Sequence, residues 1–343
     1  MSIDKLSRFL APTYENFPKG RFIGLVVLRQ TQSETIFRTE GSGEPMCSEF
    51  VDAGLRDKSS IQRVVMTKRK QVAPERRYGR EFLRAQELLY PTKDGICSLN
   101  TNSPCEMCVD CFLYGFAAGG GGGGAQKSRV WTEDAFSVLP TSDIIGERTI
   151  NAIYENGTMR LKREEDTKTS TALNTSEYIK PGVHFLDVVT IKDVTADELR
   201  YILGNILLTS RYGAVSSRVG RMENQILGAF GGIAELPSSL ELVQAVYDEL
   251  SKPLEHPLDT ETLINATKGV MSTWKNRRGV SVQLSEEELN ALIADVDRHW
   301  AEAERDNFLK RLDSSYQPFR QPPTETKKSS KSKGKKSVIE SES

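Results

Sequence analysis

The chain has 343 residues, enough for one elaborated domain or two ordinary ones. Hydrophobic residues make up 38% and charged residues 27%, with 46 Lys and Arg against 47 Asp and Glu, which is typical of a folded globular protein. The longest apolar run, from Phe22 to Leu28, is too short to span a bilayer, and the N-terminus lacks a secretory signal pattern. We therefore expect a cytoplasmic protein without membrane partners.

Apolar segments predict a mixed α+β domain. The strand candidates are residues 22–28, 64–70, 129–139, 183–191 and 225–232. Between the last two, Thr195 and Glu198 form a capping box ahead of apolar residues at helical spacing, which predicts a helix over 195–207. A second helix is predicted over 77–89. The strand–helix–strand order of 183–232 favours an α+β sheet with long insertions.

Positive charge is concentrated in two segments of this nearly neutral chain. Residues 56–84 hold ten Lys and Arg against three acids, and residues 203–222 hold three arginines and no acid. Alternate side chains of a strand over 64–70 would share one sheet face, and glycines near the three arginines would let a polyanion approach the backbone. Both segments favour nucleic-acid binding, because rows of cations neutralise phosphates. The run typical of an ordinary RNA-recognition motif is missing.

Four of the five cysteines, Cys97, Cys105, Cys108 and Cys111, have the spacing C-x7-C-x2-C-x2-C. This spacing predicts a closed structural zinc site of four thiolates. An iron–sulfur cluster is less favoured, because the closing Cys-Pro of the bacterial ligand run is missing. Unliganded buried thiols are the third interpretation. Cys47 is isolated and is expected to be a small apolar residue.

Other motifs favour structural roles. The glycines at 119–124 are not followed directly by Lys-Ser, so they indicate a flexible linker and not a phosphate-binding loop. Three scattered histidines favour structural positions, and the acids at 164–166 favour a solvated loop over a metal site. Asn156-Gly157 between two alternating stretches predicts a hairpin.

The C-terminal third is predicted to be helical and then disordered. Ser238 with Glu241, and Ser285 with Glu288, form capping boxes that head apolar stripes. Beyond residue 317, six lysines lie among Ser, Gly and Pro without apolar periodicity. We expect this segment to be a disordered basic tail.

Four segments occur in order within residues 1–250: FIGLVVLRQTQS, VVMTKRKQVAPERRYGRE, CEMCVDCFLYGFA and ILGNILLTSRYGAVSSRVGRMENQILG. Together they resemble the repeated backbone subunit of type I-D CRISPR (Cascade-type) effector complexes, in the RAMP superfamily. The resemblance implies a ferredoxin-like palm, related to RNA-recognition domains, with an inserted zinc finger region, a thumb hairpin and a helical C-terminal part. The expected boundaries are palm 1–73, 128–148 and 182–236, finger 74–127, thumb 149–181, helical part 237–317 and tail 318–343.

The resemblance also implies a function. Several copies would bind head-to-tail along CRISPR guide RNA, beside other type I-D effector subunits, and present the guide for pairing with a target DNA strand. Basic residues of the palm and finger would hold the RNA backbone while the thumb folds over the guide. The residues assigned to RNA are Lys68, Arg69, Lys70, Arg76, Arg77, Met159, Arg160, Arg211, Arg218 and Arg221. Zinc is the expected cofactor, and no catalytic residue is assigned.

Two other functions fit the same residues. Backbone subunits of related effector types cut paired target strands with a divalent metal and an acid in the loop after the first strand. That loop offers Glu34, Glu40, Glu49 and Asp52 here, and no pattern favours one of them. A zinc-containing DNA-binding regulator is the second alternative, although the sequence has no recognition-helix pattern.

Overall fold

The computed structural model describes residues 4–38, 46–118, 124–151, 160–163, 166–169 and 173–320, with the backbone alone between 150 and 174. An antiparallel sheet of eight strands lies at its centre. The strands are β1 (Phe22–Thr31), β2 (Ser48–Asp52), β3 (Ser60–Met66), β8 (Val130–Thr132), β9 (Ala135–Ser137), β14 (His184–Lys192), β15 (Met222–Gly232) and β16 (Val280–Gln283). Their order is β16-β15-β1-β14-β9-β3-β2, and β8 also pairs with β14. The predicted mixture of helices with a sheet is confirmed.

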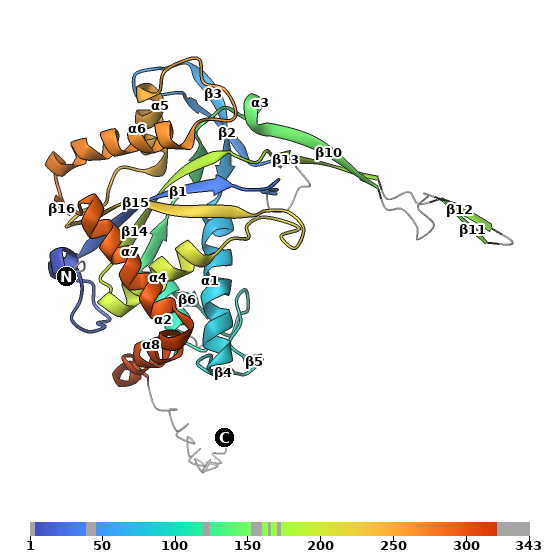
Figure 1. Ribbon diagram of the computed structural model, residues 1–343. Helices are drawn as coiled ribbons and strands as arrows, with labels where there is room; N and C mark the ends of the chain where they lie inside the picture. Colours follow the sequence, from blue (N-terminus) through green and yellow to red (C-terminus); the bar gives the residue numbers. More distant parts are fainter. Residues whose placement is uncertain are drawn as a thin grey trace, which may run out of the picture.

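Helices cover both faces of this sheet (Figure 1). They are α1 (Lys68–Ala85), α2 (Val109–Tyr114), α3 (Thr141–Ile144), α4 (Ala196–Leu208), α5 (Ser239–Glu249), α6 (Thr260–Thr273), α7 (Glu286–Trp300) and α8 (Glu302–Ser314), with 3₁₀ turns η1 (Asp4–Phe9), η2 (Trp274–Asn276) and η3 (Gln317–Phe319). Alternate residues of β1 face opposite layers. Ile23 and Leu25 pack in the cluster of α1, α4, α7 and α8, whereas Val26 and Leu28 pack in the cluster of α5 and α6.

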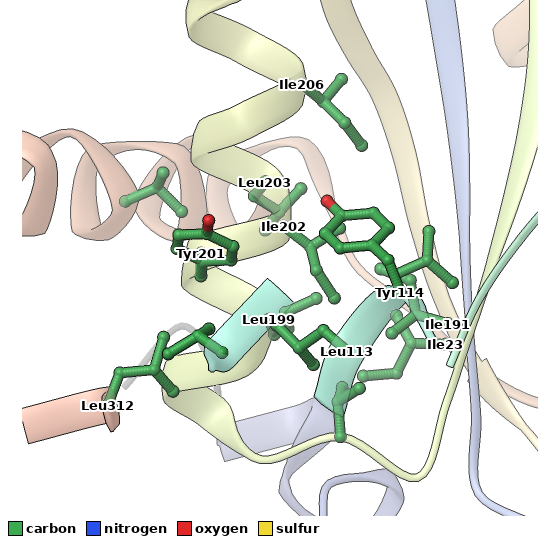
Figure 2. Packing of buried hydrophobic residues seen from close by; sticks show 14 of the residues in the cluster. Ile23, Leu113, Tyr114, Ile191, Leu199, Tyr201, Ile202, Leu203, Ile206 and Leu312 are labelled. Atoms are coloured by element: carbon green, nitrogen blue, oxygen red, sulfur yellow. The ribbon is translucent and has the colours of Figure 1, made fainter. Parts of the chain in front are cut away.

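The hydrophobic cluster that contains Ile23 and Leu25 is centred on α4. This helix connects β14 to β15, which flank β1 on either side, so it crosses over the central strand. Figure 2 shows Leu199, Ile202 and Ile206 of α4 beside Tyr114 of α2 and Ile23 of β1. The predicted capping box at the start of α4 is confirmed, because the side chains of Thr195 and Glu198 each accept the other's backbone amide.

Helix α1 begins at Lys68, well before its predicted start at Arg77. The carboxylate of Asp134 accepts the Lys68 amide at 2.8 Å and caps the helix from outside. The strand predicted over 64–70 is therefore wrong beyond Met66, and Lys68 to Lys70 project from a helical turn, not from alternating sheet positions. Pro74 lies inside the helix.

The strand predicted over 129–139 is divided into β8 and β9. Glu133 and Asp134 lie between them and leave the ladder because each caps a helix. Asp134 caps α1, and the Glu133 carboxylate accepts the Ser239 amide of α5 at 3.0 Å.

Two insertions depart from the sheet. One carries the short ribbons β4 (Pro91–Thr92) with β5 (Gly95–Ile96) and β6 (Phe116–Ala117) with β7 (Ala125–Gln126). The other is a ribbon of β10 (Ile145–Asn151) and β13 (Leu173–Ile179), which extends away from the body of the molecule in Figure 1. Strands β11 (Arg160–Arg163) and β12 (Asp166–Thr169) pair with each other. The predicted Asn156-Gly157 turn lies outside the described residues, as does most of the glycine run.

Helices α5 to α8 follow the sheet, as the two predicted capping motifs indicate. Three residues assigned to the tail, Pro318 to Arg320, belong to the folded part, because the Arg320 side chain donates to Asp313 and to the Met107 carbonyl. The remainder of the predicted tail, 321–343, lies outside the described residues. No helix in the described part of the chain is long and apolar enough to cross a membrane.

Candidate nucleic-acid interface and cysteine cluster

The N-terminal half of α1 presents basic side chains beside a groove. Lys68, Arg69 and Arg77 are exposed, and Lys70 is half-buried. Lys68 and Arg69 line a groove of about 430 Å³ between α1, the loop that follows Cys97, and β8. Its walls combine apolar residues with hydroxyl and amide groups, so the groove can accept an anion that also has an apolar part.

Arg76 lies in the wall of this groove and is committed to a protein contact. Its guanidinium donates to both carboxylate oxygens of the buried Asp110, at 3.0 and 2.7 Å. Arg80, one turn later, also donates to Asp110 at 2.7 Å and to the Cys97 carbonyl. These contacts join α1 to the cysteine segment. Bidentate arginine–carboxylate pairs fix geometry closely, so α1 and the groove wall move as one unit.

The basic loop, residues 210–221, carries three exposed arginines, Arg211, Arg218 and Arg221. Arg211 and Arg221 pair across an isolated bridge, so their side chains leave the backbone at neighbouring positions. Gly220 has a φ of +82°, and a Cβ there would lie 2.1 Å from the Tyr212 carbonyl oxygen. Glycine is therefore required for the loop to close.

A buried hydrogen-bond network lies beneath the basic loop. Arg29 of β1 is 0% exposed and donates to Asp187 at 2.9 and 3.0 Å and to Glu75 of α1 at 2.7 Å. The Tyr212 hydroxyl donates to Glu75 at 3.2 Å and accepts from Asn224 at 2.7 Å. Burial raises the pKa of both the Glu75 and Asp187 carboxyls. The network fixes the basic loop against α1, which brings the two predicted basic segments together.

The residues assigned to the thumb are only partly described. Met159 lies outside the described residues, and Arg160 is described by its backbone, which pairs with Thr169 in β12. Nearer the sheet, a second hollow of about 300 Å³ separates the β10–β13 ribbon from the basic loop and is lined by Arg148, Tyr178 and Arg218. The ribbon therefore starts next to the basic loop.

The acids considered for catalysis are dispersed. Glu34 pairs with Arg148 at 2.6 Å, and Asp52 pairs with Lys58 at 2.9 Å at the end of β2. Glu49 is exposed on β2, and Glu40 lies outside the described residues. Within the ranges that the structure describes, the four cysteines are the one group of three or more His, Cys, Asp or Glu that could hold a metal ion.

The four predicted cysteines converge. Their Sγ atoms all lie within 4.8 Å of one another, and Cys111 lies 3.8 Å from both Cys97 and Cys105. A tetrahedron with zinc–sulfur bonds of about 2.3 Å has edges of about 3.8 Å, so these residues fit a zinc ion. The Cys108 amide also donates to the Cys105 sulfur at 3.3 Å. Hydrogen bonds among the four thiols lower the pKa of Cys97 and Cys105 and raise the pKa of Cys108 and Cys111, and a metal would require all four as thiolates.

Sequence reasoning missed the residues that position these groups. Arg29, Arg80 and Asp110 carry the contacts that hold the loop, α1 and the cysteine segment together, yet they were not assigned. One signal existed for Arg29, because a charged residue that continues a strand buried on both faces requires a buried partner. Nothing in the sequence identified Asp187 or Glu75 as that partner.

Comparison with known proteins finds a family model and a similar fold. A family model described as Csc2 CRISPR matches residues 9–309. The crystal structure of Thermofilum pendens Csc2 is similar in fold, with 17% identity and a TM-score of 0.56 over 93% of this chain and 98% of that one. Two chains of CRISPR RNA-guided surveillance complexes, one of them pre-nicking, have 11% identity and TM-scores of 0.47 and 0.44, over 81% and 80% of this chain and 99% and 100% of theirs. Among curated proteins, none matches the sequence.

Proposed function

The chain belongs to the Csc2 CRISPR family, and on this premise we propose that it binds CRISPR guide RNA as the repeated backbone subunit of a type I-D Cascade-type complex. The observation that best supports this proposal is the set of exposed cations on α1 and on the basic loop. Lys68, Arg77, Arg218 and Arg221 are exposed, and none forms an ion pair with a carboxylate in the described part of the chain. These uncompensated cations lie on two segments that the hydrogen bond from Tyr212 to Glu75 joins, and such charge is the electrostatic signature of phosphate binding.

The contacts proposed for the guide are to its backbone. Lysine and exposed arginine side chains bind phosphates of any sequence, which suits a protein that must accept guides of differing sequence. The proposed phosphate contacts are Lys68, Arg69, Lys70, Arg77, Arg211, Arg218 and Arg221. Arg76 acts mainly through its pair with Asp110, so it shapes the groove wall and adds to the positive potential. Met159 and Arg160 belong to the proposed thumb.

The sheet order supports a ferredoxin-like palm. Strands β15, β1, β14 and β9 are adjacent in that order, and α1 and α4 pack together on one face. In this proposal the cysteine segment is the finger, stabilised by zinc, and the β10–β13 ribbon is the base of the thumb. Copies of the chain then stack head-to-tail along the guide, beside other type I-D subunits, and leave the guide bases free to pair with a target DNA strand.

The subunit is proposed to be non-catalytic. Glu34 and Asp52 are engaged in separate ion pairs on different elements, which does not suit a shared metal site. Incubating the guide-loaded protein with paired target strands, with and without magnesium, tests this point. Magnesium-dependent cleavage that Glu34→Gln or Asp52→Asn abolishes would support the nuclease alternative instead.

Sequencing the nucleic acid that copurifies with the protein from its native host tests the main proposal. We expect RNA that carries CRISPR spacers with repeat-derived ends. The variant Arg218→Ala/Arg221→Ala should recover much less of it at the same protein yield. Recovery of bulk cellular RNA without spacers, or of promoter-specific duplex DNA, would contradict the proposal.

A further inference from the structure

Two aromatic rings and two lysines form a cluster that the guide-binding proposal does not use. Phe22 begins β1 and pairs in register with Lys192 at the end of β14, while Trp131 lies in the neighbouring β8. The Trp131 and Phe22 rings are 6.1 Å apart and edge-to-face. The ammonium groups of Lys127 and Lys192 lie 4.8 and 4.9 Å from the centre of the Trp131 ring. We call these four residues the Trp131 platform.

The indole of Trp131 is held in place and half-exposed. Its ring nitrogen donates to the Ser128 carbonyl at 2.8 Å, so its polar atom is satisfied locally. A base that stacks on the ring would displace the Lys127 and Lys192 ammonium groups from above it toward the flanking phosphates. The other two tryptophans of the chain, Trp274 and Trp300, are each only 6% exposed. A ring that is fixed but not buried binds at a low entropic cost, because little motion is lost on contact.

The charge of the platform is uncompensated. Lys127 and Lys192 form no ion pair with any carboxylate in the described residues. Glu133, two residues after Trp131, is occupied in capping α5. A ligand with negative charge would therefore gain from both lysines.

We propose that the Trp131 platform binds a single-stranded polynucleotide, with one base stacked on the indole and the flanking phosphates on Lys127 and Lys192. Aromatic rings beside cations are the usual means of binding single strands without sequence preference. Continuity supports this ligand over an acidic protein. Val130 and Thr132 of the same strand line the groove that holds Lys68 and Arg69, so a strand leaving the groove would pass over the sheet edge onto the platform. This inference goes beyond the proposed guide contacts and concerns a separate surface.

Quenching of tryptophan fluorescence by a stacked base can report on this site, because the other two indoles are buried and a base cannot stack on them. The full chain is titrated with oligo(dT) and oligo(U), with Trp131→Phe as the spectroscopic control. We expect quenching in the native protein and none in Trp131→Phe. Base stacking of about 1–3 kcal/mol corresponds to an affinity loss of about 5- to 150-fold in Trp131→Ala. Lys127→Ala and Lys192→Ala should each weaken oligonucleotide binding and make its affinity less dependent on salt. Lys310 is an exposed lysine of α8, and Lys310→Ala should leave this affinity unchanged.

A second set of measurements tells whether the bound polynucleotide is a DNA strand or the guide RNA. Guide RNA affinity and oligo(dT) affinity are measured in each platform variant and in Arg218→Ala/Arg221→Ala. Loss of oligo(dT) binding alone assigns the platform to a DNA strand, and loss of guide affinity assigns it to the guide. If guide binding depends on Arg218 and Arg221 while platform variants change neither affinity, the platform proposal is overturned and the guide-binding function stands. Absence of quenching, with self-association of the native protein that Trp131→Ala abolishes, would also overturn it, since the surface would then bind a second copy.

Discussion

The arginines of this protein fall into two groups according to what their guanidinium groups contact. Arg29 and Arg63 are both 0% exposed, and Arg63 donates to the carbonyls of Ser137 and Ala53 at 2.6 and 2.7 Å. Arg218 and Arg221, by contrast, are exposed. Buried arginines hold elements together, whereas exposed arginines such as Arg218 and Arg221, which form no ion pair in the described residues, are the ones proposed to contact phosphates. Counting positive charge along the sequence cannot separate the two groups.

Replacing Arg218 by alanine should weaken RNA binding to the same extent for all sequences, because the side chain is proposed to contact phosphate. The slope of log affinity against log salt concentration should fall by about 0.7 to 1. Arg298→Ala is the matched control, since Arg298 is 68% exposed but pairs with Asp295 on α7. A change in sequence preference with an unchanged salt slope would contradict the assignment. Filter binding at four or five salt concentrations provides the measurement.

His184 should make the protein less stable in mild acid. Burial lowers the pKa of His184 to about 4, and its ring nitrogen lies 2.9 Å from the Thr260 hydroxyl. The unfolded chain takes up the proton near the ordinary pKa of about 6.5, so the native state loses stability as the pH falls from about 6.5 to 4. Between about pH 7 and 5 the loss is about 2 kcal/mol.

Comparison with His184→Gln isolates this effect, because other titrating groups are common to both proteins. Glutamine can still hydrogen-bond to Thr260. The difference in free energy of unfolding between the two proteins should shift by about 2 kcal/mol toward the variant when urea denaturation is repeated at about pH 5 instead of 7. A difference that does not change with pH would show that His184 titrates normally in the folded protein.

At the scale of elements, Arg76 and Arg80 join the cysteine segment to α1, and its four thiols could hold a metal ion. Cys108→Ser should abolish binding of one zinc per chain and unfold residues around the cluster, because ligand binding supplies the folding free energy of such sites. Hydrogen exchange should then rise in the finger and stay unchanged in α5 and α6, which pack on the opposite face of the sheet. Cys47→Ser, a cysteine outside the cluster, should retain the metal. Elemental analysis that finds no zinc in native protein prepared without chelators would refute this prediction.

Two helical glycines should respond to alanine with opposite signs. A Cβ on Gly204 of α4 would lie 1.8 Å from the ring nitrogen of Trp300, whereas a Cβ on Gly269 of α6 meets nothing within 4 Å. Gly204→Ala should therefore displace Trp300 from α4 and cost about 1–3 kcal/mol. Gly269→Ala should stabilise the protein by up to about 1 kcal/mol through helix propensity. Thermal unfolding of both variants tests the packing of α4 on α7, and equal effects would contradict it.

Elements whose signals are local were predictable from the sequence. The α4 helix carries its own capping box and apolar stripe, and β1 carries a continuous apolar run, so both were placed within a few residues. The start of α1 was not predictable, because Asp134, which caps it, is distant in the sequence. The strand predicted over 129–139 is likewise interrupted, because Glu133 and Asp134 cap helices. Local patterns cannot show that a residue leaves its strand to serve another element.

At the scale of the whole molecule, the family was predictable from four sequence segments, and the family match confirms it. The cysteine cluster was also predictable, because its ligand spacing is local. The connection between the two basic segments was not, since it passes through Arg29, Glu75 and Tyr212, which come from three distant elements. The sequence suggested that both segments bind RNA, but only the fold shows that they meet.

Among the described residues, no third strand lies beside the β10–β13 ribbon, which projects from the body (Figure 1). Glu147, Arg148 and Thr149 of β10 are exposed, so the ribbon buries little core of its own. An isolated two-stranded ribbon is at best marginally stable, which favours a partner. A heterologous contact, from the ribbon of one copy to the body of the next, generates an open array. Guide RNA would neutralise the like-charged surfaces that meet in such an array.

Replacing residues 152–172 by a short Gly-Ser turn should therefore impair assembly while sparing the fold. The replacement leaves Asn151 opposite Leu173, which already pair in register. The variant should still bind a short RNA through α1 and the basic loop, although it lacks Met159 and Arg160 of the proposed thumb. Native mass spectrometry with RNAs of increasing length should show mass rising in whole-protomer steps for the native protein and incomplete, irregular occupancy for the variant. One protein per RNA at every length in the native protein, even with partner subunits added, would refute head-to-tail assembly and favour an isolated RNA-binding module.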